Sequence, residues 1–563
     1  MKSKIFVGCC LMVAVAMGQV SHVVPPGTGG VNPASPFNSW ATAATNIQEA
    51  VNAAAGQGWT NVWVSNGTYT LTSQVTIAAG MTVRSWHNGA MDRAGTIVNG
   101  GNLAGNTTTN RCFYIDHADA VVAGFTITNG WAYGSSIVSD QSGGGVYVNN
   151  GLLLNCTVQG CEAQYMGGGV MVQAAGVVRD CLIKGNTAPN AAGGARVWSG
   201  MLDDCDVVSN YTGGSGGGIS LSHAGIVTNT RVRYNYSTVI GGAGGGVYIA
   251  SGGLLTHSEI SANSNNSSGT GVYMDGILAK AEYCTINGNI SYFTGVSKGG
   301  GMHLVNGAAA NHCIVSSNAA SYGGGLYLQD GTCAYSDIIG NTGHGIGANR
   351  GGGGVYVSNT GLVENCRIMH NISTNAAGIN LWDGNNIKLR NCLIAGNVST
   401  GSYGGGVYVY RGTGTVFQNS TIVSNYTPTY GGGVYLSYAT TMVENCVIYF
   451  NKNGLGGASS NLYRGSANLI CNNSCVAPSM DAYGVNNTVD DPQFVAFTPD
   501  MDADAWNFNL RSGSPCVNTG TNQFDWMLDV PDLAGRRRID RFSGLVDMGC
   551  YEHMPQGMIF NLR

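Results

Sequence analysis

Charged side chains are scarce in this chain, which has only 25 Lys and Arg and 30 Asp and Glu among 563 residues. The formal net charge is −5 and no basic cluster stands out, so the sequence lacks the electrostatic footprint of a nucleic-acid-binding protein. The apolar stretch from Ile5 to Met17 is too short to span a bilayer, and no later stretch qualifies. These absences exclude a nucleic-acid partner and predict a chain without a transmembrane segment.

A short motif recurs about a dozen times between Gly143 and Leu436, and its clearest form is GGGVY. Each copy is followed by a small residue in a fixed setting, at what is here named the cysteine position, and five residues later by an Asn. Successive cysteine positions are 23 to 30 residues apart, which indicates a solenoid. The cysteine position is occupied by Cys156, Cys181, Cys205, Thr230, Ser258, Cys284, Cys313, Ser336, Cys366, Cys392, Ser420 and Cys446.

Alternation around the cysteine position predicts short strands with one buried face. The residue two places later is always Val or Ile, whereas its neighbours are mixed and mostly polar. The glycine run leads into another strand, with Val146 and Val148 facing inward and Tyr147 outward. No part of the repeat has the pattern of an amphipathic helix, which excludes leucine-rich and helical repeats. The sequence therefore predicts an all-β fold, a single-stranded parallel β-helix whose individual coils are rungs.

Stacking of the rungs has three consequences. Equivalent residues should lie about 4.8 Å apart, so the Asn series from Asn186 to Asn451 is expected to form a ladder of amide hydrogen bonds. We expect the Asn itself to adopt the left-handed backbone that this residue tolerates. The glycine run is expected to form a tight corner where side chains would collide with the neighbouring rungs.

The N-terminal part of the chain differs from the repeats. Residues 1–18 combine Lys2 and Lys4 with the apolar segment and an Ala-Met-Gly cleavage sequence, which predicts a signal peptide and export. Residues 19–60 are expected to cap the open end of the coil with a short helix within 41–56.

The β-helix itself is expected to occupy residues 61–470, followed by a small C-terminal region at 471–563. The chain has 17 cysteines, but in-register rungs hold Cβ atoms about 4.8 Å apart, whereas a disulfide needs about 3.8 Å. Because Thr230 and Ser258 also occupy the cysteine position, we expect buried thiols there, selected for small size.

Short motifs at both ends of the chain are typical of a known group. They are 46–54 (NIQEAVNAA), 62–64 (VWV), 67–69 (GTY), 491–494 (DPQF), 507–510 (NFNL), 513–515 (GSP), 532–537 (DLAGRR) and 546–552 (VDMGCYE). With the first three, the start of the coil resembles right-handed parallel β-helix proteins of the pectin-lyase-like superfold, and the repeats resemble those of polymorphic outer-membrane proteins. With the others, the C-terminal region resembles the choice-of-anchor Q region of secreted bacterial β-helix proteins.

The resemblance implies a surface destination and allows one disulfide. Where such C-terminal regions have a small apolar residue, this chain has Cys516 and Cys550, which predicts a Cys516–Cys550 disulfide. Cys471 and Cys475 are a second candidate pair. No membrane barrel or hydrophobic sorting tail follows Arg563, so the sequence does not support membrane anchoring.

Charged residues concentrate on one outward face of consecutive rungs. Asp180 and Asp204 share the place before the cysteine position, and Asp206 should lie beside Arg231 of the next rung. Carboxylates about 5 Å apart repel unless a cation binds between them, so Asp180, Asp204 and Asp206 are candidate calcium ligands. With Arg231 or Lys184 as the base, the same group is a candidate catalytic site for β-elimination on a uronate polymer. The alternative is a set of ordinary cross-strand ion pairs.

A second outward column is aromatic. Tyr faces at this spacing nearly match the length of one sugar unit of an extended polysaccharide, so we expect an exposed ligand-binding column. Protein recognition and simple stabilisation of the sheet are the alternatives. The tyrosines are Tyr248, Tyr273, Tyr327, Tyr356, Tyr408 and Tyr435.

The sequence thus predicts a monomeric, secreted or cell-surface β-helix protein that binds an extracellular polysaccharide or another cell-surface polymer. No complete catalytic motif is present, and calcium is the only cofactor suggested. The charged face favours a polysaccharide lyase or glycoside hydrolase as one alternative. The repeats favour an adhesin or structural surface protein as another.

Overall fold

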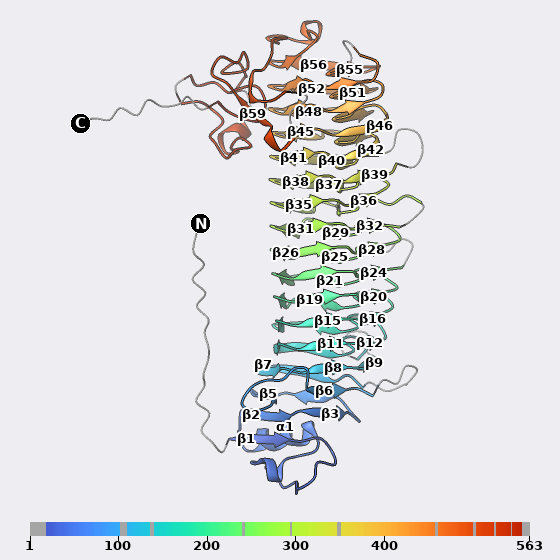
Figure 1. Ribbon diagram of the computed structural model, residues 1–563, viewed down its shortest axis with the longest axis vertical. Coiled ribbons are helices and arrows are strands. Elements are labelled where there is room, and N and C mark those ends of the chain that lie inside the picture. Colours follow the sequence, from blue (N-terminus) through green and yellow to red (C-terminus); the bar gives the residue numbers. More distant parts are fainter. Residues whose placement is uncertain are drawn as a thin grey trace, which may run out of the picture.

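The protein is described by a computed structural model that covers residues 19–101, 110–135, 140–238, 243–292, 295–345, 351–456, 460–498, 503–522, 525–541 and 543–553. Its body is a parallel β-solenoid of about 14 turns, stacked along one axis (Figure 1). The predicted signal peptide, residues 1–18, lies outside the described residues. The predicted single-stranded parallel β-helix is confirmed.

One rung shows how the repeat is built. The glycine run leads into β13 (Val170–Val172), then follow β14 (Val177–Arg179), β15 (Leu182–Lys184) and β16 (Thr187–Ala188). Strands equivalent to β13 and β14 form one sheet, those equivalent to β15 a second and those equivalent to β16 a third. Every pairing in these three sheets is between parallel strands one rung apart, for example Ile183 with Val207.

The second sheet forms the face that later carries the candidate site. Within the described residues it has 16 strands. These are β3 (Gly67–Thr70), β6 (Thr96–Asn99), β8 (Thr126–Thr128), β11 (Thr157–Gln159), β15, β19 (Asp206–Val208), β23 (Arg231–Arg233), β27 (Glu259–Ser261), β31 (Thr285–Asn287), β35 (Ile314–Ser316), β38 (Asp337–Ile339), β41 (Arg367–Met369), β45 (Leu393–Ala395), β49 (Thr421–Val423), β53 (Val447–Tyr449) and β57 (Cys475–Val476).

The interior of the coil is filled by the inward Val and Ile of each strand. Ile183, Val207, Val232 and their equivalents are fully buried and belong to one continuous core. The thiols at the cysteine position are also buried and donate to the carbonyl two residues earlier, as Cys181 does to Arg179 at 3.2 Å. Each rung therefore lengthens the hydrophobic core without making it wider, so a long chain can form a single solenoid.

The predicted asparagine ladder is confirmed. Nδ2 of Asn186 donates to Oδ1 of Asn210 at 3.0 Å and to the Val158 carbonyl at 3.0 Å. The same pattern continues rung by rung to Asn451, which donates to Asn461. These amides are buried, and the ladder satisfies polar groups that would otherwise be costly inside the coil.

The expected left-handed Asn is wrong by one residue. The residue before the Asn has the positive φ, as in Ser209 (φ 54°) and Tyr234 (φ 57°). A second left-handed residue precedes the cysteine position, as in Asp180 (φ 52°) and Tyr283 (φ 56°). The strands of the second sheet within the repeats are thus bounded by two left-handed residues. Because the chain turns sharply at these residues, their side chains point outward.

The glycine run packs against backbone, as predicted. A Cβ on Gly168 would clash with the carbonyl groups of Thr187 and Gly193, and one on Gly324 with those of Thr342 and Gly353. Only glycine allows this approach between the first and third sheets.

The N-terminal end is closed by α1 (Ile47–Gly56), in agreement with the prediction. The side chain of Asn46 caps the helix by accepting from the backbone N–H groups of Gln48 and Glu49. The buried residues of the helix are Ile47, Ala50, Val51 and Ala54, which belong to the core of the coil. The winding also includes β1 (Val20–Val23), which pairs with β2 (Asn61–Ser65), so the parallel sheet begins within the segment expected to be only a cap.

At the other end the coil runs to β57, slightly past the expected boundary at 470. Residues 477–553, the C-terminal module, then fold back beside the last rungs (Figure 1). The module contains an antiparallel pair, β58 (Phe494–Ala496) and β59 (Asn507–Leu510), and three short 3-10 helices, at Asp481–Tyr483, Ala503–Ala505 and Asp525–Leu528. Its apolar core is shared with the outer face of the second sheet through Leu393, Val423 and Val447.

The predicted Cys516–Cys550 disulfide is not formed. Both residues are buried and free. The backbone N–H of Cys550 donates to the Thr421 hydroxyl at 3.1 Å, whereas the Cys516 thiol lies against Cys475. Cys471 and Cys475 do not pair either, because Cys471 faces the core of the coil and Cys475 faces the module.

Candidate functional site

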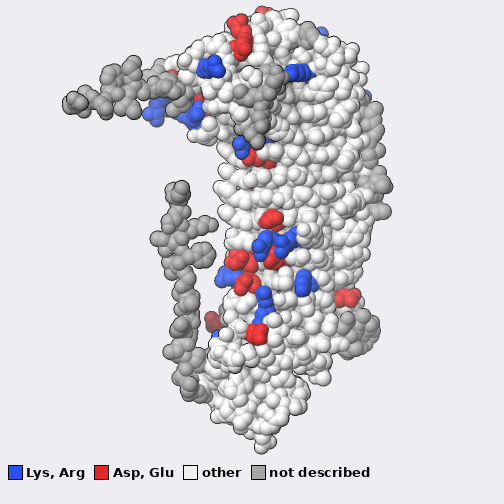
Figure 2. Space-filling model, viewed as in Figure 1, with Lys and Arg blue, Asp and Glu red and all other residues white. Residues whose placement is uncertain are grey.

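The charged face contains ion pairs. Arg231 binds Asp206 in a bidentate manner, with Nε–Oδ1 at 2.7 Å and Nη2–Oδ2 at 2.6 Å, and Arg233 approaches the same carboxylate at 3.4 Å. The hydrogen bonds that Arg231 donates to the Asp206 carboxylate raise the pKa of Arg231. One rung away Arg179 binds Asp203 at 2.9 Å. Figure 2 shows a patch of mixed Lys, Arg, Asp and Glu over the lower middle of this face, with other charges near the C-terminal module and at the top of the coil. Asp206 and Arg231 therefore form the cross-strand ion pair that the sequence analysis gave as the alternative to a catalytic site.

The candidate catalytic group is not brought together as one site. Asp180 and Asp204 lie at the corner before β15 and β19, while Lys184 ends β15 on the opposite edge of the sheet. Four residues of strand separate Asp180 from Lys184 by about 13 Å, too far for the two to act on one sugar carbon. Lys184 instead lines a shallow depression of about 370 Å³ with Gln159, Val208 and small residues.

Calcium binding by Asp180, Asp204 and Asp206 stays a prediction. Across the described ranges, no group of three or more His, Cys, Asp or Glu side chains could hold a metal ion. Asp206 is also committed to two arginines. A cation at this corner would therefore depend on Asp180 and Asp204 together with backbone or solvent oxygens.

The predicted tyrosine column exists, but it is covered. Tyr248 pairs in register with Tyr273, Tyr327 with Tyr356, and Tyr408 with Tyr435. Tyr327, Tyr356 and Tyr408 are only 5%, 4% and 2% exposed, and the other three are half-buried. The column is completed by His303 and Asn380, which occupy the same position in the intervening rungs.

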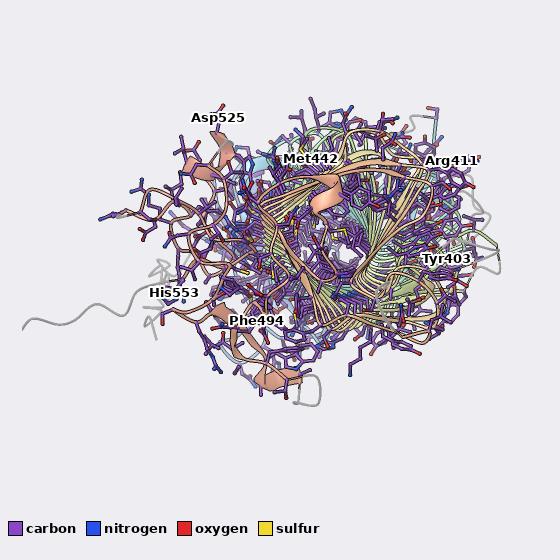
Figure 3. The ribbon with its side chains drawn as sticks, turned by 90° about the horizontal axis from the view of Figure 1, so that it is seen from above. Tyr403, Arg411, Met442, Phe494, Asp525 and His553 are labelled. Carbon is purple, nitrogen blue, oxygen red and sulfur yellow. The ribbon has the colours of Figure 1, made fainter. Side chains whose placement is uncertain are left out.

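A second layer of aromatic residues explains why the tyrosine column is buried. Tyr322 stacks on Tyr356 at a centroid distance of 5.4 Å, and Tyr403 stacks on Tyr435 at 4.7 Å. Burial raises the pKa of Tyr273 to about 12, so its hydroxyl stays protonated. Seen along the axis, Tyr403 lies on the side of the coil away from the C-terminal module (Figure 3). The expectation that the column is exposed is wrong for Tyr327, Tyr356 and Tyr408, whose rings pack within the protein. Ligand binding by the three half-buried tyrosines stays a prediction.

A different aromatic column is exposed. His257, Tyr283, His312 and Tyr335 occupy the place before the cysteine position in four consecutive rungs; we name them the exposed ladder. Each lies at the left-handed corner that precedes a strand of the second sheet, with φ between 46° and 56°. Tyr283 is 51% exposed and Tyr335 is 38% exposed. This is the same position that Asp180 and Asp204 occupy nearer the N-terminus.

The rings of the exposed ladder stack face to face. Centroid distances are 5.0 Å from His257 to Tyr283, 4.7 Å from Tyr283 to His312 and 5.0 Å from His312 to Tyr335. Interplanar angles of 18°, 21° and 5° leave the ring edges pointing outward. Burial raises the pKa of Tyr335, which keeps its phenol a hydrogen-bond donor. The ladder therefore presents imidazole and phenol groups alternately along the axis.

The ladder leads into a cleft beneath the C-terminal module. His312 and Tyr335 line this cleft, which has a volume of about 490 Å³, together with Pro531 and Leu533 of the module. Its floor carries the ion pair between Arg367 and Asp337, whose Nε–Oδ1 distance is 2.6 Å. A chain lying along the ladder would thus meet Pro531 and Leu533 of the module.

The module closes the cleft by binding the next members of the same column. The Nδ2 atoms of Asn365 and Asn391 donate to the Pro531 carbonyl at 3.3 and 2.9 Å. Asn445 both donates to the Thr521 carbonyl and accepts from its N–H. The position before the cysteine position therefore changes in character along the coil. It is acidic at Asp180 and Asp204, aromatic in the exposed ladder, and bound to the module from Asn365 onward.

Sequence reasoning missed the exposed ladder although its signal was visible. His257 and Tyr283 share the register of Asp180 and Asp204, which the charge pattern had singled out. The tyrosines after the glycine runs recur more regularly, so the sequence predicts the ligand-binding column there. Only the packing of the corner distinguishes the two columns.

Comparisons with known proteins support the fold. A family model described as "Right handed beta helix region" matches residues 330–494. The coil resembles the A-module of the mannuronan C-5 epimerase AlgE6 of Azotobacter vinelandii, with 13% identity, 80% of this chain and 97% of that chain covered, and a TM-score of 0.29. Pectate lyase Pel9A has 15% identity, with 96% and 98% covered and a TM-score of 0.24.

The surface adhesin PfbA of Streptococcus pneumoniae is another similar structure, with 10% identity, 82% and 93% covered, and a TM-score of 0.28. No curated protein matches the chain. The family match over residues 330–494 agrees with the parallel β-helix seen in the structure, and the activity is left to be argued from the site. In the part of the chain that the structure describes, no helix is long and apolar enough to cross a membrane.

Proposed function

We propose that the protein is exported and binds an extended extracellular polysaccharide along the exposed ladder, with the polymer end entering the cleft beneath the C-terminal module. The observation that carries the proposal is the stacked series His257–Tyr283–His312–Tyr335, whose ring centroids repeat at 4.7 to 5.0 Å along the axis. This spacing is comparable to one sugar unit of an extended chain. A polymer with a hydroxyl pattern at that repeat would meet equivalent partners on each rung.

The carboxylates beside the ladder favour binding over glycoside hydrolysis. Near the ladder the carboxylates of Asp206 and Asp337 are engaged by Arg231 and Arg367. A glycoside hydrolase needs two carboxyl groups about 5–10 Å apart with distinct proton states, and a lyase needs a base within hydrogen-bond reach of the substrate. The carboxylates engaged by arginine do not form a hydrolase pair, whereas His257 and His312 are imidazoles of the kind that serves as a lyase base. The function we propose is recognition, with the protein acting as a monomer, and the product assay below distinguishes it from a lyase.

The test is a binding measurement on the purified protein with a panel of neutral and uronate polysaccharides, by affinity electrophoresis or calorimetry. The double variant Tyr283→Ala/Tyr335→Ala removes two rings of the ladder. We expect it to weaken binding by about tenfold or more, because about 1.4 kcal/mol per tenfold is within the range of two aromatic contacts.

Tyr234→Ala is the matched control. Tyr234 also has a left-handed backbone (φ 57°) and is 62% exposed, but it lies at the opposite edge of the second sheet. It should leave binding unchanged. Unsaturated products formed from a uronate polymer would instead show a lyase, and cell binding without any bound polysaccharide would show an adhesin; either result contradicts the proposal.

A further inference from the structure

A second pocket lies on the far side of the C-terminal module. It has a volume of about 530 Å³ and is formed between the last rungs of the coil and the module. Its lining is rich in amides and has one acidic and no basic side chain. It consists of Glu444, Asn472, Asn473, Val485, Asn486, Gly520, Thr521, Asn522 and Leu545.

Glu444 is the unusual residue of this pocket. It ends β52 (Thr440–Glu444), is only 6% exposed, and pairs in register with Gln418 on one side and Asn472 on the other. Its carboxyl group has a side-chain hydrogen bond with Asn472, but Oε2 has no hydrogen-bond partner among the described residues. Burial raises the pKa of this carboxyl group. An unpartnered buried oxygen is costly, and a ligand that donates to it would offset the cost.

The equivalent glutamate three rungs earlier is paired. Glu364 also lies two residues before the cysteine position, and its Oε1 is 3.8 Å from Nη1 of Arg390. The rung after Glu444 has Asn472 in place of an arginine, and the neighbouring module contributes only amide, hydroxyl and apolar groups to the lining. Glu444 therefore lacks the cationic partner that Glu364 has.

The remaining lining suits a polyhydroxylated ring. The amides of Asn473 and Asn522 and the hydroxyl of Thr521 provide donors and acceptors around the carboxyl group. Val485 and Leu545 are 61% and 40% exposed and contribute an apolar wall. A negatively charged ligand would lack any basic partner and would face Glu444.

We propose that this pocket binds a single non-acidic sugar unit, neutral or amino-substituted, with Glu444 accepting a hydrogen bond from its hydroxyl or amino group. The site is separate from the exposed ladder, because the module covers Asn391 and Asn445 of the intervening column. The two binding activities can therefore be lost independently.

Saturation-transfer NMR on the purified protein tests the proposal with glucose, glucosamine and glucuronate as probes. We expect saturable binding of glucose or glucosamine, no binding of glucuronate, and about tenfold weaker binding after Glu444→Gln, which keeps the shape but removes the charge and one acceptor site. Glu364→Gln is the matched control and should leave this binding unchanged.

A second variant distinguishes an amino-substituted sugar from a neutral one and does not change a core residue. Asn486 lies exposed at the rim with a left-handed backbone (φ 57°), which Asp also tolerates. Asn486→Asp should strengthen glucosamine binding and leave glucose binding nearly unchanged. Loss of polymer binding in the Tyr283→Ala/Tyr335→Ala variant should not affect either sugar. Absence of binding by both sugars, binding of glucuronate, or an unchanged affinity in Glu444→Gln would overturn the proposal.

Discussion

Two aromatic columns run along this coil, and they differ in what covers them. The tyrosine column follows the glycine runs and is covered by a second layer that includes Tyr322 and Tyr403. The exposed ladder stands at a sharp corner of the second sheet with no such layer over Tyr283, which is 51% exposed. Both columns have the same vertical registry, and both contain Tyr and His. Registry alone therefore does not reveal function; the packing beside the column decides between stability and binding.

The largest effect expected from this difference is in the tyrosine column. Tyr408 is 2% exposed and contacts the rings of Tyr403 and Tyr435. Tyr408→Ala should reduce the free energy of unfolding by about 3–5 kcal/mol, as for other buried aromatic truncations. The measurement is denaturant unfolding followed by circular dichroism. Tyr438→Ala, at a site that is 64% exposed, is the control and should have a much smaller effect; equal losses would contradict the comparison.

A smaller effect is expected from acid. His303 is 5% exposed, packs edge-on against Tyr273 and Tyr327 at 4.9 and 4.7 Å, and has no hydrogen-bond partner on either ring nitrogen among the described residues. Burial, with a contribution from Lys298, lowers its pKa to about 3. Below pH 6.5 the unfolded chain binds a proton that the folded protein excludes, so stability falls with decreasing pH, by about 2 kcal/mol at pH 5.

His303→Tyr would continue the tyrosine column and remove the contribution of His303 to the loss of stability in acid. Unfolding midpoints at pH 7 and pH 5 should then differ less in the variant than in the original protein. An unchanged difference between the two pH values would show that other groups cause the acid sensitivity.

The smallest effect on stability is expected at the exposed ladder. Tyr283→Ala removes two stacked contacts, with His257 and His312, from a half-exposed ring. We expect a loss of about 1 kcal/mol in the free energy of unfolding. A loss as large as that of Tyr408→Ala, measured under the same conditions, would mean that the ladder is part of the fold and not a surface for a ligand.

The repeat could be predicted closely because its signals are local and periodic. The inward series around Ile183, the asparagine ladder from Asn186 and the capping helix around Val51 all follow from spacing and side-chain type. The left-handed residue was misplaced by one position, because Ser209 and Tyr234 carry no intrinsic preference for that backbone.

The candidate site could be predicted only in part. The register of Asp206 and Arg231 followed from the repeat, and so did the existence of the tyrosine column. The burial of Tyr408, the contact of Cys516 with Cys475 and the position of the module over Asn391 and Asn445 depend on segments far apart in the sequence. No spacing rule within a repeat contains that information.

The asparagine ladder has a consequence for how such a protein changes length. Each amide donates in the same direction, from Asn186 to Asn210 and onward, so every coil presents to the next the acceptor that it requires. A whole coil could be duplicated or deleted without leaving an unmatched amide, whereas a partial one could not. The number of rungs between Asp180 and the C-terminal module would then set the length of polymer that the surface can bind.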